Sequence, residues 1–169
     1  WALVYWDDIS VLFLRKTGKY GDIALKDEYK FISPDKEPTD IFRELLTPEK
    51  QKDITRELLR NIAETNSSFG NALFGIMYNS EGRDKEAIEV FKKVKKGSKI
   101  GGFDLEYTAF TLSGDSYMKL GRLDESLESF QKALKLNKDA HYGLALFYKS
   151  TKNREKAIEH FEKYLKIHK

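Results

Sequence analysis

The fold of this chain is decided by the stretch Gly114-Asp-Ser-Tyr117-Met-Lys-Leu-Gly121-Arg-Leu-Asp-Glu-Ser126-Leu-Glu-Ser-Phe130. Gly114 and Tyr117 are three places apart, and Ser126 and Phe130 are four apart. Because residues at these spacings share one face of a helix, the stretch predicts two amphipathic helices. Gly121 lies between them, where a helix commonly ends in a left-handed residue. A helical hairpin is therefore expected.

The same pattern of small residue, Tyr, Ala or Ser, and Phe occurs on both sides of this stretch. The two further sets are Gly75, Tyr78, Ala87 and Phe91, and Ala145, Tyr148, Ala157 and Phe161. Gly82 ends the first helix of the first set, and in the last set Asn153 of Lys152-Asn153 is expected to replace that glycine. The sequence thus predicts three hairpins in series.

These units resemble tetratricopeptide repeats over residues 67–169. The resemblance implies a short α-solenoid of stacked helix pairs, whose concave groove binds a protein or peptide. The spacing departs from the family, since the Phe positions are 39 and 31 residues apart instead of about 34. The longer interval is assigned to an extended loop, residues 96–102, and the family's proline at the end of each unit is missing.

Upstream, Thr47-Pro48 has the residue types of a helix start, an N-cap followed by proline. We expect this helix to run to Thr65, after a shorter helix from Asp40 to Leu46. Its predicted buried face carries Ile54, Leu58, Leu59 and Ile62. Together the two helices are interpreted as a degenerate half-repeat that caps the stack.

The first 34 residues have a different character. Residues 2–6 and 9–15 are rich in β-branched and aromatic types and flank the polar pair Asp7-Asp8, which predicts a β-hairpin. Tyr20 to Leu25 is expected to add a third strand, and Ser33 to Pro38 is interpreted as a connector. Both faces of the hairpin strands are apolar, so both faces are expected to be covered.

The fold class expected is therefore mainly α, a solenoid of three helical hairpins preceded by one or two helices and an N-terminal β-hairpin or small sheet. Strands should be confined to about the first 30 residues. The predicted divisions are 1–34 for the hairpin, 35–66 for the connector and capping helices, and 67–169 for the solenoid. The solenoid divides further into units at 67–96, 104–136 and 139–169.

Residues 1–15 are also similar to a segment of some bacterial polytopic membrane glycosyltransferases, in which a soluble tail with such repeats follows the last span. This resemblance implies an alternative, an extracytoplasmic C-terminal accessory domain. The chain starts at Trp1 without Met, and we expect it to be a soluble piece of a larger protein, without direct membrane insertion, because its apolar runs are far shorter than a span of about 20 residues. Its compartment, extracytoplasmic or cytoplasmic, stays open.

Composition narrows the function classes. The 30 Lys+Arg and 27 Asp+Glu residues leave a net charge of only +3, which argues against a nucleic-acid binder. The absence of cysteine excludes disulfides, thiolate metal sites and a Cys nucleophile.

No residue cluster carries a recognisable catalytic pattern. Adjacent Asp7 and Asp8 are interpreted as turn formers. The histidines His141, His160 and His168 lack zinc-site spacing, and Gly97–Gly102 lacks the Gly-Lys-Ser/Thr ending of a phosphate loop. The basic cluster is interpreted as a solvated helix end and consists of Lys92, Lys93, Lys95, Lys96 and Lys99. We expect no enzyme, no metal and no cofactor.

The resemblance does imply a partner-binding groove along the first helix of each unit. Projected onto this sequence, its lining is Phe69, Ala72, Ile76, Asn79, Thr108, Thr111, Asp115, Met118, Asp139, Tyr142, Leu146 and Lys149. Paired Lys and Asn, with which some family members hold a terminal carboxylate, are missing at these places. The expected function is a protein–protein interaction module for an internal peptide segment or a partner protein, without a role in nucleic-acid binding.

The last helix offers a second surface. Tyr164, Leu165 and Ile167 have no further amphipathic helix to cover them, so part of this apolar face should be exposed. Weak homo-oligomer formation through the C-terminal helix is expected.

Overall fold

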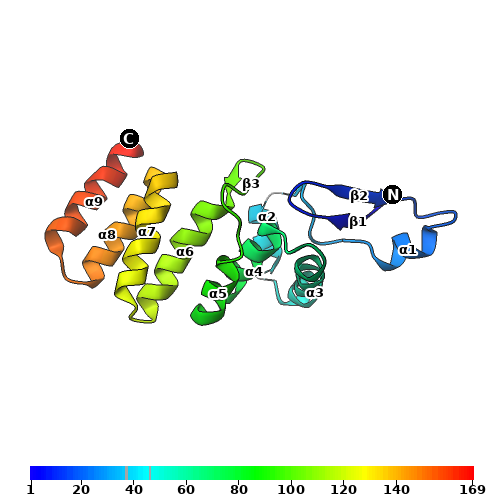
Figure 1. Ribbon diagram of the computed structural model, residues 1–169, viewed down its shortest axis with the longest axis horizontal. Coiled ribbons are helices and arrows are strands. Elements are labelled where there is room, and N and C mark those ends of the chain that lie inside the picture. Colours follow the sequence, from blue (N-terminus) through cyan, green and yellow to red (C-terminus); the bar gives the residue numbers. More distant parts are fainter. Residues whose placement is uncertain (37, 46) are drawn as a thin grey trace.

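The computed structural model describes residues 1–36, 38–45 and 47–169 and shows an elongated row of helices, with a β-hairpin at one end and the C-terminal helix at the other (Figure 1). The helices, in chain order, are α1 (Gly21–Lys26), α2 (Pro38–Leu45), α3 (Pro48–Thr65), α4 (Ser68–Ser80), α5 (Asp84–Phe91), α6 (Leu105–Lys119), α7 (Leu123–Leu136), α8 (His141–Ser150) and α9 (Arg154–Ile167), with a 3-10 turn at Lys138–Ala140. The strands are β1 (Ala2–Trp6), β2 (Val11–Leu14), β3 (Lys99–Ile100) and β4 (Phe103–Asp104). The expected fold class, a mainly helical solenoid with an N-terminal hairpin, is confirmed.

The pairs α4–α5, α6–α7 and α8–α9 form the three predicted hairpins. The small residue of the pattern lets the phenylalanine ring of the second helix lie on the backbone of the first. A Cβ added at Gly75 would lie 2.5 Å from the ring of Phe91, and one at Gly114 would lie 2.9 Å from that of Phe130. The spacing between the small residue and Phe therefore indicates where the two helices of a hairpin pack closely.

Two of the three predicted helix ends are confirmed. Gly82 and Gly121 adopt φ angles of +72° and +73°. In the third hairpin the left-handed residue is Lys152, with a φ of +62°, whereas Asn153 has a φ of −86° and accepts a hydrogen bond from the backbone N–H of Lys156. The prediction for Asn153 was wrong because its side chain caps the start of α9 instead.

The long interval between the first and second hairpins contains a second, very small sheet. β3 pairs antiparallel with β4, with Ile100 opposite Phe103. Gly101 and Gly102 form the turn with φ angles of +52° and +81°, which favour glycine. The prediction that strands are confined to the first 30 residues was therefore wrong.

α3 begins at Pro48 and ends at Thr65, as predicted, and α2 begins two residues before the expected Asp40. The predicted end of that shorter helix, Leu46, lies outside the described residues. α2 and α3 contact each other and both contact α4, in the manner of a preceding repeat.

The buried face of α3 was predicted only in part. Ile54 and Leu58 are fully buried and Ile62 is partly buried, but Leu59 is half-exposed. The fully buried polar residue Asn61 takes its place, because its Nδ2 donates a hydrogen bond to the carbonyl of Trp6 at 2.8 Å. The N-terminal β-hairpin therefore determines which side of α3 is buried.

The predicted N-terminal hairpin is confirmed, and its third strand is not. β1 and β2 are antiparallel, with an irregularity between Leu3 and Tyr5. Residues 21–26 form α1 instead, and the other edge of β1 is engaged by Tyr29, whose N–H donates to the carbonyl of Leu3 at 2.7 Å. Asp22 in the first turn and Lys26 in the last also favour a helix electrostatically.

The two strands of the hairpin differ in burial. Ala2 and Trp6 of β1 are fully buried, and the Trp6 ring packs on Tyr29 and Phe69, at centroid distances of 6.1 and 5.3 Å. In β2, by contrast, Val11, Leu12 and Phe13 are 52%, 49% and 50% exposed. The expectation that both strands are covered on both faces was therefore right for β1 and wrong for β2.

Candidate partner-binding groove

The first helices of the three hairpins, α4, α6 and α8, lie next to one another along the solenoid, since α4 contacts α6 and α6 contacts α8. Their predicted lining residues differ in accessibility. In α6 the residues Thr108, Thr111, Asp115 and Met118 are all partly buried. The hydroxyls of Thr108 and Thr111 donate to the backbone carbonyls four residues earlier, both at 2.9 Å. Their methyl groups therefore make this surface more apolar.

Polar contacts hold the middle of this surface. Asn79 of α4 donates from Nδ2 to the Ser116 hydroxyl of α6 at 2.8 Å and so joins neighbouring units. Lys119 lies 2.6 Å from Asp115 and 3.8 Å from Asp84, and the hydrogen bond to Asp115 raises the pKa of Lys119. The negative charge of Asp115 is therefore already compensated.

In the third unit the predicted residues lie near α9. The half-exposed Tyr142 packs against Phe161 and Tyr164, with ring centroids 6.1 and 5.3 Å apart. Asp139 accepts a contact of 3.0 Å from Nε2 of His168. Leu146 is partly buried and Lys149 is exposed, which leaves an apolar side chain beside a cation.

Two residues assigned to the groove in the first unit are inaccessible. Phe69 and Ala72 are 1% and 0% exposed. Phe69 faces Trp6 of the hairpin, and Ala72 belongs to the same core. Neither can contact a partner, because Trp6 of the hairpin covers Phe69 and the core encloses Ala72. Ile76 and Asn79 remain partly accessible.

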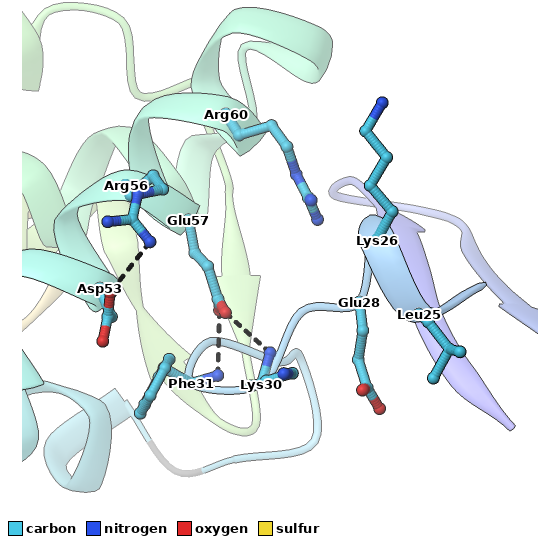
Figure 2. Close-up of a pocket in the computed structure, with 9 residues that line it drawn as sticks. All are labelled: Leu25, Lys26, Glu28, Lys30, Phe31, Asp53, Arg56, Glu57 and Arg60. Atoms are coloured by element: carbon cyan, nitrogen blue, oxygen red, sulfur yellow. Dashed lines mark hydrogen bonds and ion pairs between the residues drawn. The ribbon is translucent and has the colours of Figure 1, made fainter. Parts of the chain in front are cut away.

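A separate charged pocket of about 370 Å³ lies between the segment after α1 and α3 (Figure 2). Glu57 accepts hydrogen bonds from the backbone N–H groups of Lys30, Phe31 and Ile32 at 2.8 to 3.0 Å. Arg60 donates to the carbonyl of Asp27. These contacts anchor the loop to the helix. No signal near Glu57 could have revealed them, because its partners are 25 to 27 residues away.

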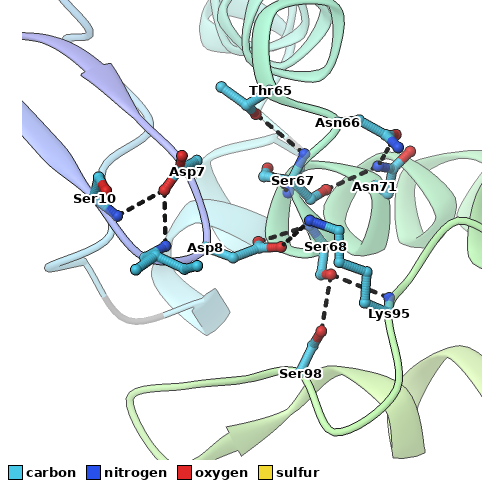
Figure 3. A network of polar contacts seen from close by, with 12 residues as sticks. Asp7, Asp8, Ser10, Thr65, Asn66, Ser67, Ser68, Asn71, Lys95 and Ser98 are labelled. Carbon is cyan, nitrogen blue, oxygen red and sulfur yellow. Dashed lines mark hydrogen bonds and ion pairs between the residues drawn. The ribbon is translucent and has the colours of Figure 1, made fainter.

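The hairpin tip is fixed by a polar network (Figure 3). Asp7 accepts from the N–H groups of Ile9 and Ser10, which lowers its pKa. Asp8 accepts from the N–H of Ser68 at the start of α4 at 2.7 Å, and from Nζ of Lys95 at 3.0 Å. The interpretation of Asp7 as a turn former is confirmed, whereas Asp8 attaches the hairpin tip to Ser68 and Lys95.

The histidines form no metal centre in the part of the chain that the structure describes, where no group of three or more potential ligands is found. His141 and His160 approach each other, with their Nδ1 atoms 2.9 Å apart. Burial lowers the pKa of both rings. The pair joins α8 to α9.

A row of helical hairpins joined by tight turns, with small residues under aromatic rings, defines a helical-repeat solenoid. Residues 111–169 match the tetratricopeptide repeat family model, so the chain carries tetratricopeptide repeats in its C-terminal part. The first of the three hairpins lies outside the matched residues.

Solved structures share the fold. MamA AMB-1 in crystal form C2221 is 22% identical, with a TM-score of 0.57 and coverage of 88% of this chain and 89% of MamA. MamA MSR-1 in crystal form C2 is 20% identical, with a TM-score of 0.58 and coverage of 85% and 83%. No curated protein matches the sequence. At these identities the likeness concerns the fold.

The second resemblance noted in the sequence gains no support from these matches. The similarity of residues 1–15 to a segment of membrane glycosyltransferases stays a prediction. Within the described residues, no helix has the length and apolar character that crossing a membrane requires.

Proposed function

We propose that this chain is a non-enzymatic protein–protein interaction module that holds an internal peptide segment, or a surface of a partner protein, along α4, α6 and α8. Repeats of this kind stack helices into extended concave surfaces, which suit elongated partners. The proposal thus rests first on the tetratricopeptide repeat match.

One observation supports the position of the binding surface. Ile76, Thr111 and Leu146 lie on consecutive first helices, and each side chain is partly buried instead of sealed in the core. A row of apolar groups with partial access suits the side chains of an extended segment, whose backbone polar groups can still reach Asn79 or Lys149.

The polar pattern argues against one class of ligand. Ala72 is buried, Asp115 pairs with Lys119, and Leu146 is apolar, so these places supply no cationic clamp for a terminal carboxylate. The segment bound is therefore expected to be internal, with apolar side chains facing the groove.

The test is a selection of peptides from a random phage-displayed library on the immobilised 169-residue chain. Selected peptides should be rich in apolar residues, and Thr111→Arg in the groove should weaken their binding by about tenfold or more. Gln131→Arg, on the exposed side of α7, is the matched control and should leave binding unchanged. Equal binding to both variants would place the binding surface elsewhere.

A further inference from the structure

The outer edge of β2 is open. β1 is hydrogen-bonded to β2 on one side and to Tyr29 on the other, so it is the inner strand. Among the residues that the structure describes, no backbone group pairs with the edge of β2 that faces away from β1. In Figure 1 this edge lies at the end of the molecule opposite α9. A further strand can therefore approach it.

The edge strand also carries no residue type that normally protects an open edge. β2 has the sequence Val-Leu-Phe-Leu, without a charge or a proline, and Val11, Leu12 and Phe13 are each about half-exposed. Ile9, beside the strand, is 94% exposed. Natural proteins place lysine, proline or a covering loop at such edges because an open apolar strand pairs with other chains. An exposed edge of this kind is typical of an interface.

The charges at the two ends of the strand indicate which occupant fits. The turn before the strand carries Asp7 and Asp8, and Arg15 and Lys16 follow the strand, with the Arg15 guanidinium over the ring of Trp1 at 5.1 Å. An identical strand in antiparallel orientation brings the acidic end of one copy to the basic end of the other. A parallel copy would bring like charges together. The strand is therefore complementary to itself in one direction only.

We propose that β2 pairs antiparallel with β2 of a second copy of this chain, so that two hairpins form a four-stranded sheet across a two-fold axis. A register centred on Leu12 places Val11 of one copy opposite Phe13 of the other, and Ser10 opposite Leu14. Cross-strand pairs of these kinds stabilise antiparallel sheets. The pairing also removes half-exposed apolar side chains from water.

Sedimentation velocity over a range of micromolar concentrations tests the pairing. The unmodified chain should form dimers, and Leu12→Lys should weaken the dimer by about tenfold or more, since it places two cations near the axis. Leu123→Lys is the matched control, because Leu123 is also exposed, at 43%, but lies at the start of α7. Circular dichroism and thermal unfolding of both variants establish that they remain folded.

Cross-linking gives a second readout that does not depend on dimer strength. Because the chain has no cysteine, a single Leu12→Cys substitution can form a disulfide only between copies. Oxidation should give a covalent dimer with Leu12→Cys and much less with Leu123→Cys. An unmodified chain that stays monomeric together with a Leu12→Cys variant that does not cross-link, or a dimer that Leu12→Lys leaves intact, would overturn the proposal. Binding to anionic lipid vesicles without dimer formation would also overturn it and assign the strand to a membrane surface.

Discussion

Phe130 packs closely against two neighbouring helices of the solenoid. Its ring lies on Gly114 of its own hairpin and also on Gly143 of the next one, where an added Cβ would be 2.5 Å from the ring. One side chain therefore fixes two helix–helix distances, that of α6 to α7 and that of α7 to α8. The Ser126 hydroxyl supports the first of these by donating to the carbonyl of Gly114 at 2.8 Å.

Gly143→Ala should lower the free energy of unfolding by about 1–3 kcal/mol, because the methyl group overpacks against the Phe130 ring. Chemical denaturation measures this change. Combining it with Phe130→Leu is the control, since removal of the ring makes room for the methyl group. In that background Gly143→Ala should be neutral or stabilising, because alanine favours a helix by about 1 kcal/mol over glycine. Equal losses in both backgrounds would contradict the proposed contact.

At the scale of elements, α8 and α9 are held together by a contact that depends on pH. His141 on α8 and His160 on α9 share the short Nδ1–Nδ1 contact, and Tyr148 of α8 packs near His160 at 5.5 Å. The charged groups that face the pair are Lys138 from the preceding turn and Lys156, Glu159 and Lys163 from α9. Burial and the surrounding cations lower both pKa values, so the folded state favours neutral rings.

The last hairpin should therefore lose stability as the pH falls. A lowered pKa in the folded state means that the unfolded chain, with the ordinary value of 6.5, binds protons first. The contribution of the neutral histidine pair to the free energy of unfolding is complete above pH 6.5 and decreases below it. Thermal unfolding at pH 7.5 and pH 5.5, values chosen to lie about one unit on either side, should show a larger decrease of the midpoint for the unmodified chain than for His160→Gln. His168→Gln, which leaves the pair intact, should behave like the unmodified chain.

Local sequence patterns predicted the repeated helical hairpins correctly. They failed where contacts with distant segments of the chain determine the structure. The small-residue, Tyr and Phe spacings place all three hairpins, because each is stabilised within about 20 residues of chain. Tyr20 to Leu25 has strand-like composition, yet Gly21–Lys26 forms α1, with Asp22 in the first turn and Lys26 in the last. Phe69 has the correct phase for the groove, but Trp6 of the hairpin, which covers it, comes some sixty residues earlier in the chain. No periodicity within α4 records that cover.

At the scale of the whole molecule, the two ends of the solenoid are unequal. In α7, Leu127 and Leu134 pack beside Phe147 of the next hairpin. The equivalent positions of α9, 31 residues further on, are Ile158 and Leu165, which are 47% and 56% exposed. The helix face that packs against the next hairpin in α7 is therefore exposed to solvent in α9. This exposure supports the proposal that copies of the chain associate weakly through the C-terminal helix.

Sedimentation equilibrium at high micromolar concentration tests this second contact in the Leu12→Lys variant, so that pairing through β2 does not contribute. Adding Ile158→Lys and Leu165→Glu should abolish any residual association, because the exposed apolar stripe of α9 then carries charge. Adding Gln131→Glu, a charge change on the exposed side of α7 instead of α9, should preserve it. A Leu12→Lys variant that is already strictly monomeric would exclude self-association through α9.

The attachment of the hairpin tip has a consequence for the time course of folding. Asp8 contacts Ser68 and Lys95, which are 60 and 87 residues away, whereas Ser126 and Gly114 within one hairpin are 12 apart. Closing a long loop costs more entropy, and distant contacts form later. The repeats should therefore assemble first, and the N-terminal segment should dock last. Contacts made after the transition state slow unfolding without speeding folding. The tip network at Asp8 thus acts as a latch that extends the lifetime of the assembled solenoid.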